Sequence, residues 1–329
     1  MHRVVLSLVG ATLALSGAPA GAQQQPLELR EWEVPWPNTR PRDPYVAPDG
    51  KVWFVGQQGH YIASFDPTNE QFRKFDLEPG TGPHNLIVDQ DGMVWYAGNR
   101  AAHIGKVDPR TGAITKYPMP DPAARDPHTL VFAPDGNIWF TLQGANMIGH
   151  LVTSTGEVHL LSVPTPRARP YGIKVDASGR PWIVLLGTNK LATVDPRTME
   201  LTEIVIPRES ARPRRLEIVG GKLWIADYGA GYLVSYDPQN RTFEEWRMPA
   251  GPDSEPYGTA ADSSGVVWLV EGGVNPNMFV GFDTRTKRFV RATALGEGRG
   301  TVRHMVYHRP TGTVWFGTDR ETIGRAKVE

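Results

Sequence analysis

Residues 127–152, PHTLVFAPDGNIWFTLQGANMIGHLV, hold the pattern that decides the fold. A Pro followed by a large side chain opens an apolar run, an Asp-Gly turn follows, and Trp139 lies in the next apolar run. Short apolar runs joined by Asp-Gly turns are typical of antiparallel hairpins. This stretch therefore predicts consecutive short strands connected by tight turns.

The pattern recurs along the chain. Tryptophans in equivalent contexts follow one another at steps of 42, 44, 43, 42, 44 and 47 residues. They are Trp53, Trp95, Trp139, Trp182, Trp224, Trp268 and Trp315. Upstream of six of them lies a Pro with a large residue after it: Pro44-Tyr45, Pro83-His84, Pro127-His128, Pro170-Tyr171, Pro213-Arg214 and Pro256-Tyr257. Four short strands in each of seven repeats predict an all-β, seven-bladed propeller with antiparallel blades.

The two ends of the chain complement each other. The seventh repeat stops after its third expected strand, residues 322–327, whereas residues 29–35 resemble the fourth strand of other repeats, such as residues 243–249. We expect the N-terminal strand to complete the last blade, which leaves no long exposed sheet edge. Residues 23–329 are thus predicted to form one propeller domain.

The first residues have the features of an export signal. A short basic start precedes a mostly apolar run over residues 4–15, and Ala20-Gly21-Ala22 fits a cleavage site. The run is shorter than the ~20 residues of a membrane-spanning helix. We therefore predict a signal peptide over residues 1–22 and a periplasmic or secreted protein.

Composition excludes several classes of function. Thirty-five Lys and Arg balance thirty-five Asp and Glu, so no basic footprint for nucleic acid exists. The chain has no Cys, which excludes disulfides, thiolate metal sites and a cysteine nucleophile. We expect a monomer without a nucleic-acid partner or a membrane span, which takes a small-molecule or peptide ligand at the mouth of the central channel.

Polar residues are expected to converge at that mouth, because the first strand of each blade lines the channel. The expected residues follow the Pro positions, or are acidic side chains just before a Pro or just after a second strand. They are Tyr45, His84, Asp126, His128, Tyr171, Arg214, Asp227, Glu255, Tyr257, Glu271, Arg303, His304 and Asp319. Histidines, carboxylates and tyrosines on one face predict a polar pocket or a cation site.

Three segments resemble a known family. Residues 170–173 (PYGI), 137–141 (NIWFT) and 146–149 (NMIG) are similar to the repeats of streptogramin B lyases (virginiamycin B lyases), a family of seven-bladed propellers. The resemblance covers the whole mature chain. It implies ring opening of a cyclic depsipeptide by elimination, in which a His removes a proton and a Mg²⁺ on acidic residues polarises the ester carbonyl.

The resemblance also assigns positions. It places Tyr257 at the family's His in blade six, Arg303 or His304 at the His in blade seven, and Asp319 at the last acid. Pro83-His84 followed by Asp126-Pro127-His128 repeats the family's order in blades two and three. An imidazole titrates near neutrality, which suits proton abstraction.

The candidate roles follow from these positions. We expect His84, His128 and His304 as catalytic residues, Asp126 and Asp319 as Mg²⁺ ligands, and Tyr45, Tyr171, Arg214, Tyr257 and Glu271 as substrate-binding residues. Three functions stay open at this point: a Mg²⁺-assisted lyase, a propeller that binds a ligand or partner without catalysis, and a metal-dependent lactonase of the gluconolactonase type.

Overall fold

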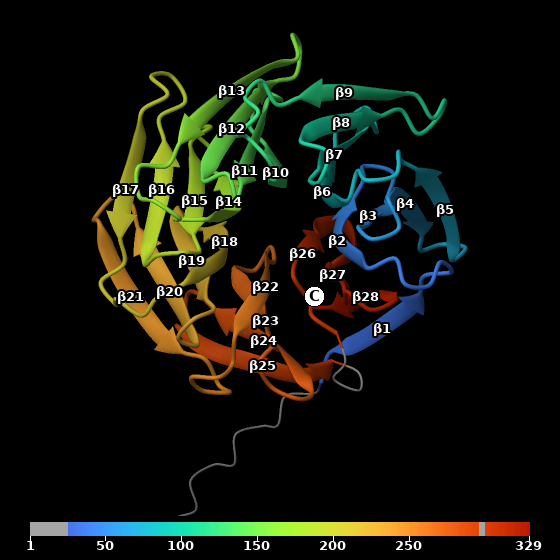
Figure 1. Ribbon diagram of the computed structural model, residues 1–329. Helices are drawn as coiled ribbons and strands as arrows, with labels where there is room; N and C mark the ends of the chain where they lie inside the picture. The colour runs from blue at the N-terminus through green and yellow to red at the C-terminus, as the bar shows by residue number, and fades with distance from the viewer. Residues whose placement is uncertain (1–25, 296–299) are drawn as a thin grey trace, which may run out of the picture.

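Seven sheets surround a central channel in the computed structural model, which describes residues 26–295 and 300–329 (Figure 1). Each sheet has four antiparallel strands, as the repeat predicted. The predicted signal peptide, residues 1–22, lies outside the described residues. In the part of the chain that the structure describes, no helix has the length and apolar character needed to cross a membrane.

The strands are short, and in blades 1 to 6 they follow one another in chain order from the channel to the outside of the ring. Their bounds are, for blade 1, β2 (Pro41–Val46), β3 (Val52–Gly56), β4 (Tyr61–Asp66) and β5 (Gln71–Asp76); for blade 2, β6 (Pro83–Val88), β7 (Val94–Gly98), β8 (His103–Val107) and β9 (Ile114–Pro118); for blade 3, β10 (Pro127–Phe132), β11 (Ile138–Leu142), β12 (Met147–Val152) and β13 (Glu157–Ser162).

The remaining blades repeat this arrangement. Their bounds are, for blade 4, β14 (Pro170–Val175), β15 (Pro181–Leu185), β16 (Lys190–Val194) and β17 (Leu201–Val205); for blade 5, β18 (Pro213–Val219), β19 (Lys222–Asp227), β20 (Tyr232–Asp237) and β21 (Thr242–Arg247); for blade 6, β22 (Pro256–Ala261), β23 (Val266–Glu271), β24 (Asn277–Asp283) and β25 (Arg288–Leu295); for blade 7, β26 (Met305–His308), the short helix η1 (Arg309–Thr311), β27 (Thr313–Gly317), β28 (Thr322–Lys327) and β1 (Glu28–Glu33).

The N-terminal strand closes the ring, as expected from the sequence. β1 pairs antiparallel with β28, with Trp32 opposite Ile323. Figure 1 shows β1 beside β28 in blade 7. The Trp32 ring stacks on Trp315 at a centroid distance of 5.5 Å and lies 5.0 Å from Phe65 of blade 1. The closing strand therefore also helps join blade 7 to blade 1.

The repeated tryptophans pack in the core between blades. Trp95, Trp139 and Trp268 are no more than 2% exposed. The indole N–H of Trp95 donates to Asp89 at 2.9 Å, and that of Trp268 donates to Asp262 at 2.8 Å. The Asp that begins each of these turns thus also satisfies the buried indole donor, which explains why the two residue types recur together.

A β-bulge interrupts the inner strand of six blades. In β6 the register shifts between Pro83 and Leu86, and shifts also follow the first Pro of β10, β14, β18 and β22, whereas in β2 the shift comes one residue later, between Arg42 and Tyr45. A bulge places two residues opposite one and re-aims their side chains. As a result, two consecutive residues of one inner strand make contacts across the channel.

One predicted equivalence is wrong. Pro41 pairs with Gly56 just as Pro83 pairs with Gly98, so Arg42, and not Tyr45, occupies the position of His84. Tyr45 instead lies opposite Trp53 and packs against the core between blades. The expected placement of Tyr45 at the channel mouth is therefore not found.

Candidate functional site

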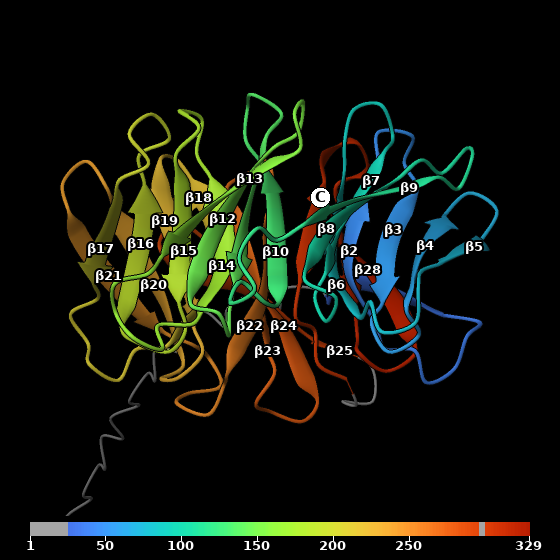
Figure 2. The same ribbon diagram turned by 45° about the horizontal axis from the view of Figure 1, so that its top comes forward.

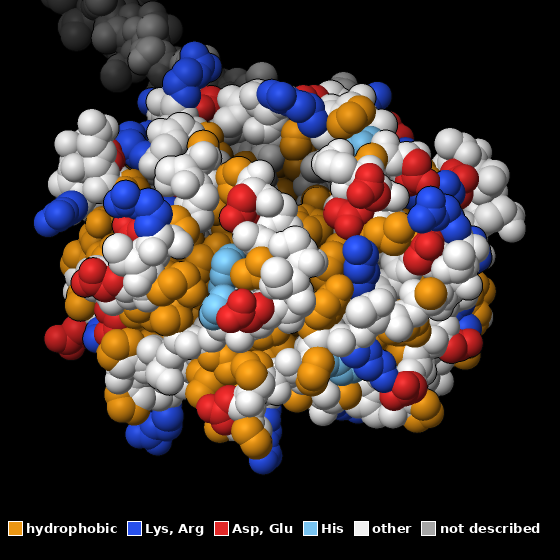
Figure 3. All heavy atoms as spheres, turned by 90° about the horizontal axis from the view of Figure 1, so that it is seen from above, with side chains coloured by type: hydrophobic (Ala, Val, Ile, Leu, Met, Phe, Trp, Pro, Cys, Tyr) orange, Lys and Arg blue, Asp and Glu red, His pale blue; other side chains and the backbone are white. Residues whose placement is uncertain are grey.

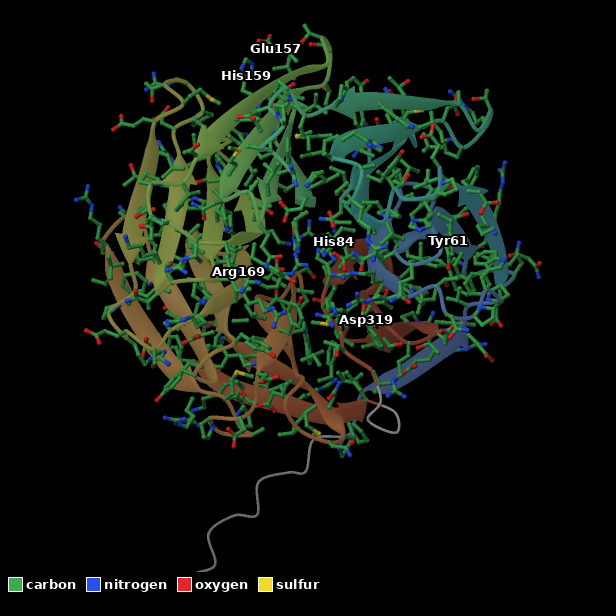
Figure 4. The ribbon with its side chains drawn as sticks, in the orientation of Figure 1. Tyr61, His84, Glu157, His159, Arg169 and Asp319 are labelled. Atoms are coloured by element: carbon green, nitrogen blue, oxygen red, sulfur yellow. The ribbon has the colours of Figure 1, made fainter. Side chains whose placement is uncertain are left out.

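The site is formed by pairs of consecutive residues, which lie at or beside the bulge of the inner strand in six blades and directly before β26 in blade 7, where no register shift occurs. The first residues of each pair, in blade order, are Arg42, His84, His128, Tyr171, Arg214, Tyr257 and Arg303, and the second residues are Asp43, Asn85, Thr129, Gly172, Arg215, Gly258 and His304. Figure 4 shows the labelled side chains of His84 and Asp319 near the centre of the ring. Figure 2 shows the same ring tilted, with β9 and β13 on its outside.

A buried carboxylate lies at the centre of this set. Asp43 accepts hydrogen bonds from Arg42 Nε at 2.9 Å, Asn85 Nδ2 at 3.1 Å and Arg215 Nη2 at 3.5 Å. Burial alone would raise the pKa of Asp43, but the surrounding positive charges, that of Arg42 above all, outweigh it and lower this pKa well below its ordinary value. Asp43 is therefore ionised and links blades 1, 2 and 5 across the channel.

The structure brings two predicted histidines together. The rings of His84 and His128 lie 3.6 Å apart, and His128 Nδ1 is 2.8 Å from Thr129 Oγ1. Burial is the main reason why both imidazole pKa values are lowered, and the charges of Arg42 and Arg215 lower them further. Both rings are therefore neutral at pH 7.

Two tyrosines meet beside them. The hydroxyls of Tyr171 and Tyr257 hydrogen-bond to each other. The guanidinium carbon of Arg214 lies 3.7 Å from the ring centroid of Tyr257, and Arg303 Nη1 lies 3.5 Å from the Tyr257 hydroxyl. Burial raises the pKa of Tyr171 to about 12. Burial would also raise the pKa of Tyr257, but four neighbouring arginines, Arg214 first among them, lower it below its ordinary value.

The predicted acids of the mouth hold loops in place. Asp126 accepts the backbone N–H groups of Gly144 at 2.6 Å and Ala145 at 3.1 Å. Glu271 accepts the backbone N–H of Ala250 at 2.8 Å. Burial raises the pKa of both carboxyl groups. These side chains thus satisfy backbone donors instead of pointing at a shared ligand position.

Asp319 has a different partner set. It forms ion pairs with Arg303 and, at 3.2 Å, with Arg40. Its Oδ2 is used in both contacts, whereas Oδ1 is buried without a hydrogen-bond partner. Asp319 also lines a pocket of about 550 Å³ between blades 6 and 7, together with Asn277 and Thr301.

These acids do not fit a Mg²⁺ site. Hard cations prefer several charged oxygens at one point. Within residues 26–295 and 300–329, no group of three or more His, Asp or Glu side chains is placed to hold a metal ion. Asp126 is committed to backbone amides and Asp319 to two guanidinium groups. The described donors therefore favour an anion over a cation.

Arginines gather at the channel mouth. Five of them, Arg40, Arg42, Arg214, Arg215 and Arg303, lie there with the carboxylates of Asp43 and Asp319, and the carboxylates of Asp126, Glu255 and Glu271 lie in the surrounding loops and strand ends. By contrast, Figure 3 shows basic and acidic side chains interspersed on the outer surface of the ring. The arginines are thus concentrated in the channel, whereas the whole chain is balanced in charge.

Several buried polar atoms of the mouth have no partner. They are Arg42 Nη2, His84 Nδ1, Arg214 Nε, His304 Nδ1 and Asp319 Oδ1. Leaving a buried donor unsatisfied costs about 1–3 kcal/mol. Burial lowers the pKa of His304 to about 3, so this imidazole is also neutral. Polar groups of this kind converging in one place are typical of a ligand-binding site.

Besides Arg40, sequence reasoning missed four of the residues that build the site, namely Arg42, Asp43, Asn85 and Arg215. Arg42 had a signal: Pro41 lies twelve residues before Trp53, as Pro83 lies twelve before Trp95. The other three are second residues of bulged pairs, and no periodic pattern predicts a bulge. Arg303 rather than His304 takes the first position in blade 7, because Met305 pairs with Phe316 as Leu86 pairs with Tyr96.

The comparisons with known proteins agree with this architecture. A sequence profile of the virginiamycin B lyase family matches residues 12–274. This chain belongs to the virginiamycin B lyase family. A search of curated proteins found no significant match.

Solved structures share the family's fold. A streptogramin B lyase superposes with a TM-score of 0.83 at 24% identity, covering 92% of this chain and 98% of that one. The virginiamycin B lyase of Staphylococcus aureus gives 0.83 at 21% identity, covering 92% and 100%. Hydrazine synthase of Kuenenia stuttgartiensis gives 0.73 at 14% identity, covering 88% and 97%. At these identities the similarity shows the propeller fold alone.

Proposed function

We propose that this member of the virginiamycin B lyase family binds a small molecule carrying a carboxylate, or an anion of similar shape, at the channel mouth. The observation that carries the proposal is that guanidinium nitrogens of Arg42 and Arg214 are buried there without partners. A carboxylate that reaches these nitrogens would accept hydrogen bonds from them. Guanidinium groups suit such ligands because their planar donors match the two oxygens.

Anion binding is favoured over the two metal-dependent alternatives. A Mg²⁺-assisted lyase and a lactonase both need carboxylates that are free to hold the cation. Asp126 and Glu271 accept backbone donors, and Asp319 pairs with arginines. Arg42 and Arg214 keep unpartnered nitrogens at the channel, and in the proposed function these nitrogens bind the anion.

A thermal-shift experiment tests this proposal. Succinate and citrate should raise the melting temperature, whereas the neutral diamide of succinate should not, because it lacks the charge. Binding at one hundred times Kd corresponds to about 2.7 kcal/mol of stabilisation. Arg214→Gln should abolish the shift. Arg110→Gln, on an outer turn where the Arg110 side chain is 75% exposed, is the matched control and should keep it.

Two outcomes would overturn anion binding. One is that no carboxylate shifts the melting temperature of the parent protein. The other is that Mg²⁺ stabilises the protein, EDTA reverses the effect, and Asp319→Asn removes it. The second result would restore the metal-dependent lyase as the better explanation.

We also propose that the protein acts outside the cytoplasm, because residues 1–22 have the composition of a signal peptide. N-terminal sequencing of the protein from a periplasmic fraction should find a start near Gln23. Retention of Met1 on protein from the cytoplasmic fraction would contradict this localisation.

A further inference from the structure

We propose that His150 and His159 bind a divalent transition-metal ion, such as Cu²⁺ or Zn²⁺, on the outer part of blade 3. Imidazole nitrogens suit Cu²⁺, Zn²⁺ and Ni²⁺, and the chain has no Cys that could compete for such an ion. The pair lies outside the channel, so this inference does not depend on the proposed anion binding.

The register of two strands places the imidazoles together. β12 pairs antiparallel with β13, and His150 lies directly opposite His159. Their ring centroids are 6.1 Å apart and their planes differ by 20°. A metal ion held by both rings lies about 2.0–2.1 Å from each nitrogen. Two such bonds, together with the radii of the two rings, span this separation once the rings turn so that their nitrogens face each other.

The contacts of the two rings allow this turn. His150 Nδ1 is buried without a hydrogen-bond partner, and a metal ion would give this nitrogen the partner that it lacks. The His150 ring rests on the ring of Trp139 at a centroid distance of 4.4 Å, which is an apolar contact. The side chain of His159 is 44% exposed. Turning the His150 ring therefore breaks no hydrogen bond at this nitrogen, and His159 has room to follow.

Acidic side chains beside the pair favour a cation. Glu157 Oε1 lies 3.5 Å from His159 Nε2, and Figure 4 shows these two labelled residues next to each other on the outside of the ring. Burial lowers the pKa of His150, and the negative charge of Asp135 acts in the opposite direction. A carboxylate beside the second nitrogen of a metal-binding His orients the ring and strengthens its bond to the metal. Glu157 is placed to do this for His159.

The histidine pair of the channel has the opposite surroundings. The charges of Arg42 and Arg215 act on both His84 and His128, and they oppose the entry of a cation. The two pairs therefore suit ligands of opposite charge. On blade 3, no third His, Asp or Glu of the described residues is placed to complete a metal site made of protein alone. Water supplies the remaining ligands, and the ion exchanges with solution.

Titration with Cu²⁺ is the first test, because Cu²⁺ binds nitrogen ligands most tightly among these ions. The mature chain without a histidine tag, freed of metal with EDTA and dialysed, should bind the ion in calorimetry. Its electron paramagnetic resonance spectrum should show two imidazole nitrogens. His150→Gln and His159→Gln should each weaken binding by at least about 10-fold. His308→Gln is the matched control, because His308 is also a half-buried strand residue but lies opposite Thr313.

The role of Glu157 is the second test. Glu157→Gln should weaken Cu²⁺ binding by about 10-fold and leave both nitrogens bound to the metal, because the carboxylate acts through His159. Glu244→Gln, at a side chain that is 44% exposed on blade 5, should keep the parent affinity. Affinity should also fall below pH 6.5, where protons compete for the imidazoles. Mg²⁺ in excess should not displace Cu²⁺, because Mg²⁺ prefers oxygen ligands.

Melting temperatures separate lost binding from lost folding. Weaker binding in His159→Gln at an unchanged melting temperature would support the site, because this side chain is exposed and its loss leaves the core intact. Parent affinity in both histidine variants would overturn the site, and so would a spectrum with fewer than two imidazole nitrogens. Parent protein that binds neither Cu²⁺ nor Zn²⁺ would overturn it as well, and none of these results would affect anion binding at the channel mouth.

Discussion

Asp43 is the single residue whose loss should disturb the channel most. It is buried and pairs with Arg42 and Arg215 on two different blades. Removing one partner of a buried pair leaves uncompensated charge and costs about 3–5 kcal/mol. Asp43→Asn should lower the free energy of unfolding by that amount in a urea titration. Asp49→Asn, at a side chain that is 54% exposed, should change it by less than about 0.5 kcal/mol.

The buried histidines make stability depend on pH. His84, His128 and His304 have lowered pKa values, so below pH 6.5 the unfolded chain binds protons that the folded protein does not. Stability therefore falls as the pH drops from 6.5 toward about 3, where His304 titrates in the folded state. The depressed pKa of Asp43 acts below the ordinary Asp range, whereas the raised pKa values of Asp126 and Glu271 oppose the histidine effect, because these carboxyl groups take up protons in the folded protein first.

Urea unfolding at pH 7.5 and 4.5 should detect this loss. In His304→Gln the difference between the two pH values should be smaller than in the parent. The matched control is His159→Gln on the outer rim, where Figure 4 shows the labelled His159 beside Glu157 and where its side chain is 44% exposed. Equal pH dependence in His304→Gln and the parent would contradict the assignment.

At the scale of elements, β1 gives the clearest prediction. A chain that starts at residue 36 loses Trp32 and Val34 from the core and exposes the edge of β28. Loss of a buried aromatic side chain alone costs about 3–5 kcal/mol, and an open edge promotes aggregation. Melting and light scattering should show a less stable, aggregating protein compared with a chain that starts at residue 26. An unchanged melting temperature would mean that β1 is dispensable for closure.

The elements also explain how far sequence reasoning could go. The strands, the Trp positions and the closing strand follow from hydrophobic period and turn chemistry, which are local properties, and the structure confirms them. The bulges are not local in this sense: whether Asn85 or Arg215 reaches the channel depends on how the inner strand pairs with its neighbour. For that reason the histidine pair was foreseen, whereas the Asp43 network across blades was not.

For the whole molecule, the same reasoning explains why the predicted acids did not converge. Residues before and after the inner strands were expected at one mouth because they are close in the ring. Their side chains, however, are short and lie next to unsatisfied backbone N–H groups of the loops, as at Asp126 and Glu271. A carboxylate satisfies the donor within reach, and only a structure shows which donor that is.

The pairing of β1 with β28 gives the ring a seam that is held by hydrogen bonds rather than by peptide bonds. Glu28 lies opposite Lys327, so a short added turn could join residues 329 and 26 and convert the seam into an ordinary hairpin. The chain could then be opened elsewhere, for example between Asp121 and Pro122 in an exposed loop. Such a circular permutant should fold to the same ring with the same channel, because every blade would still have its four strands. The position of the N-terminus along the ring therefore does not determine the geometry of the site.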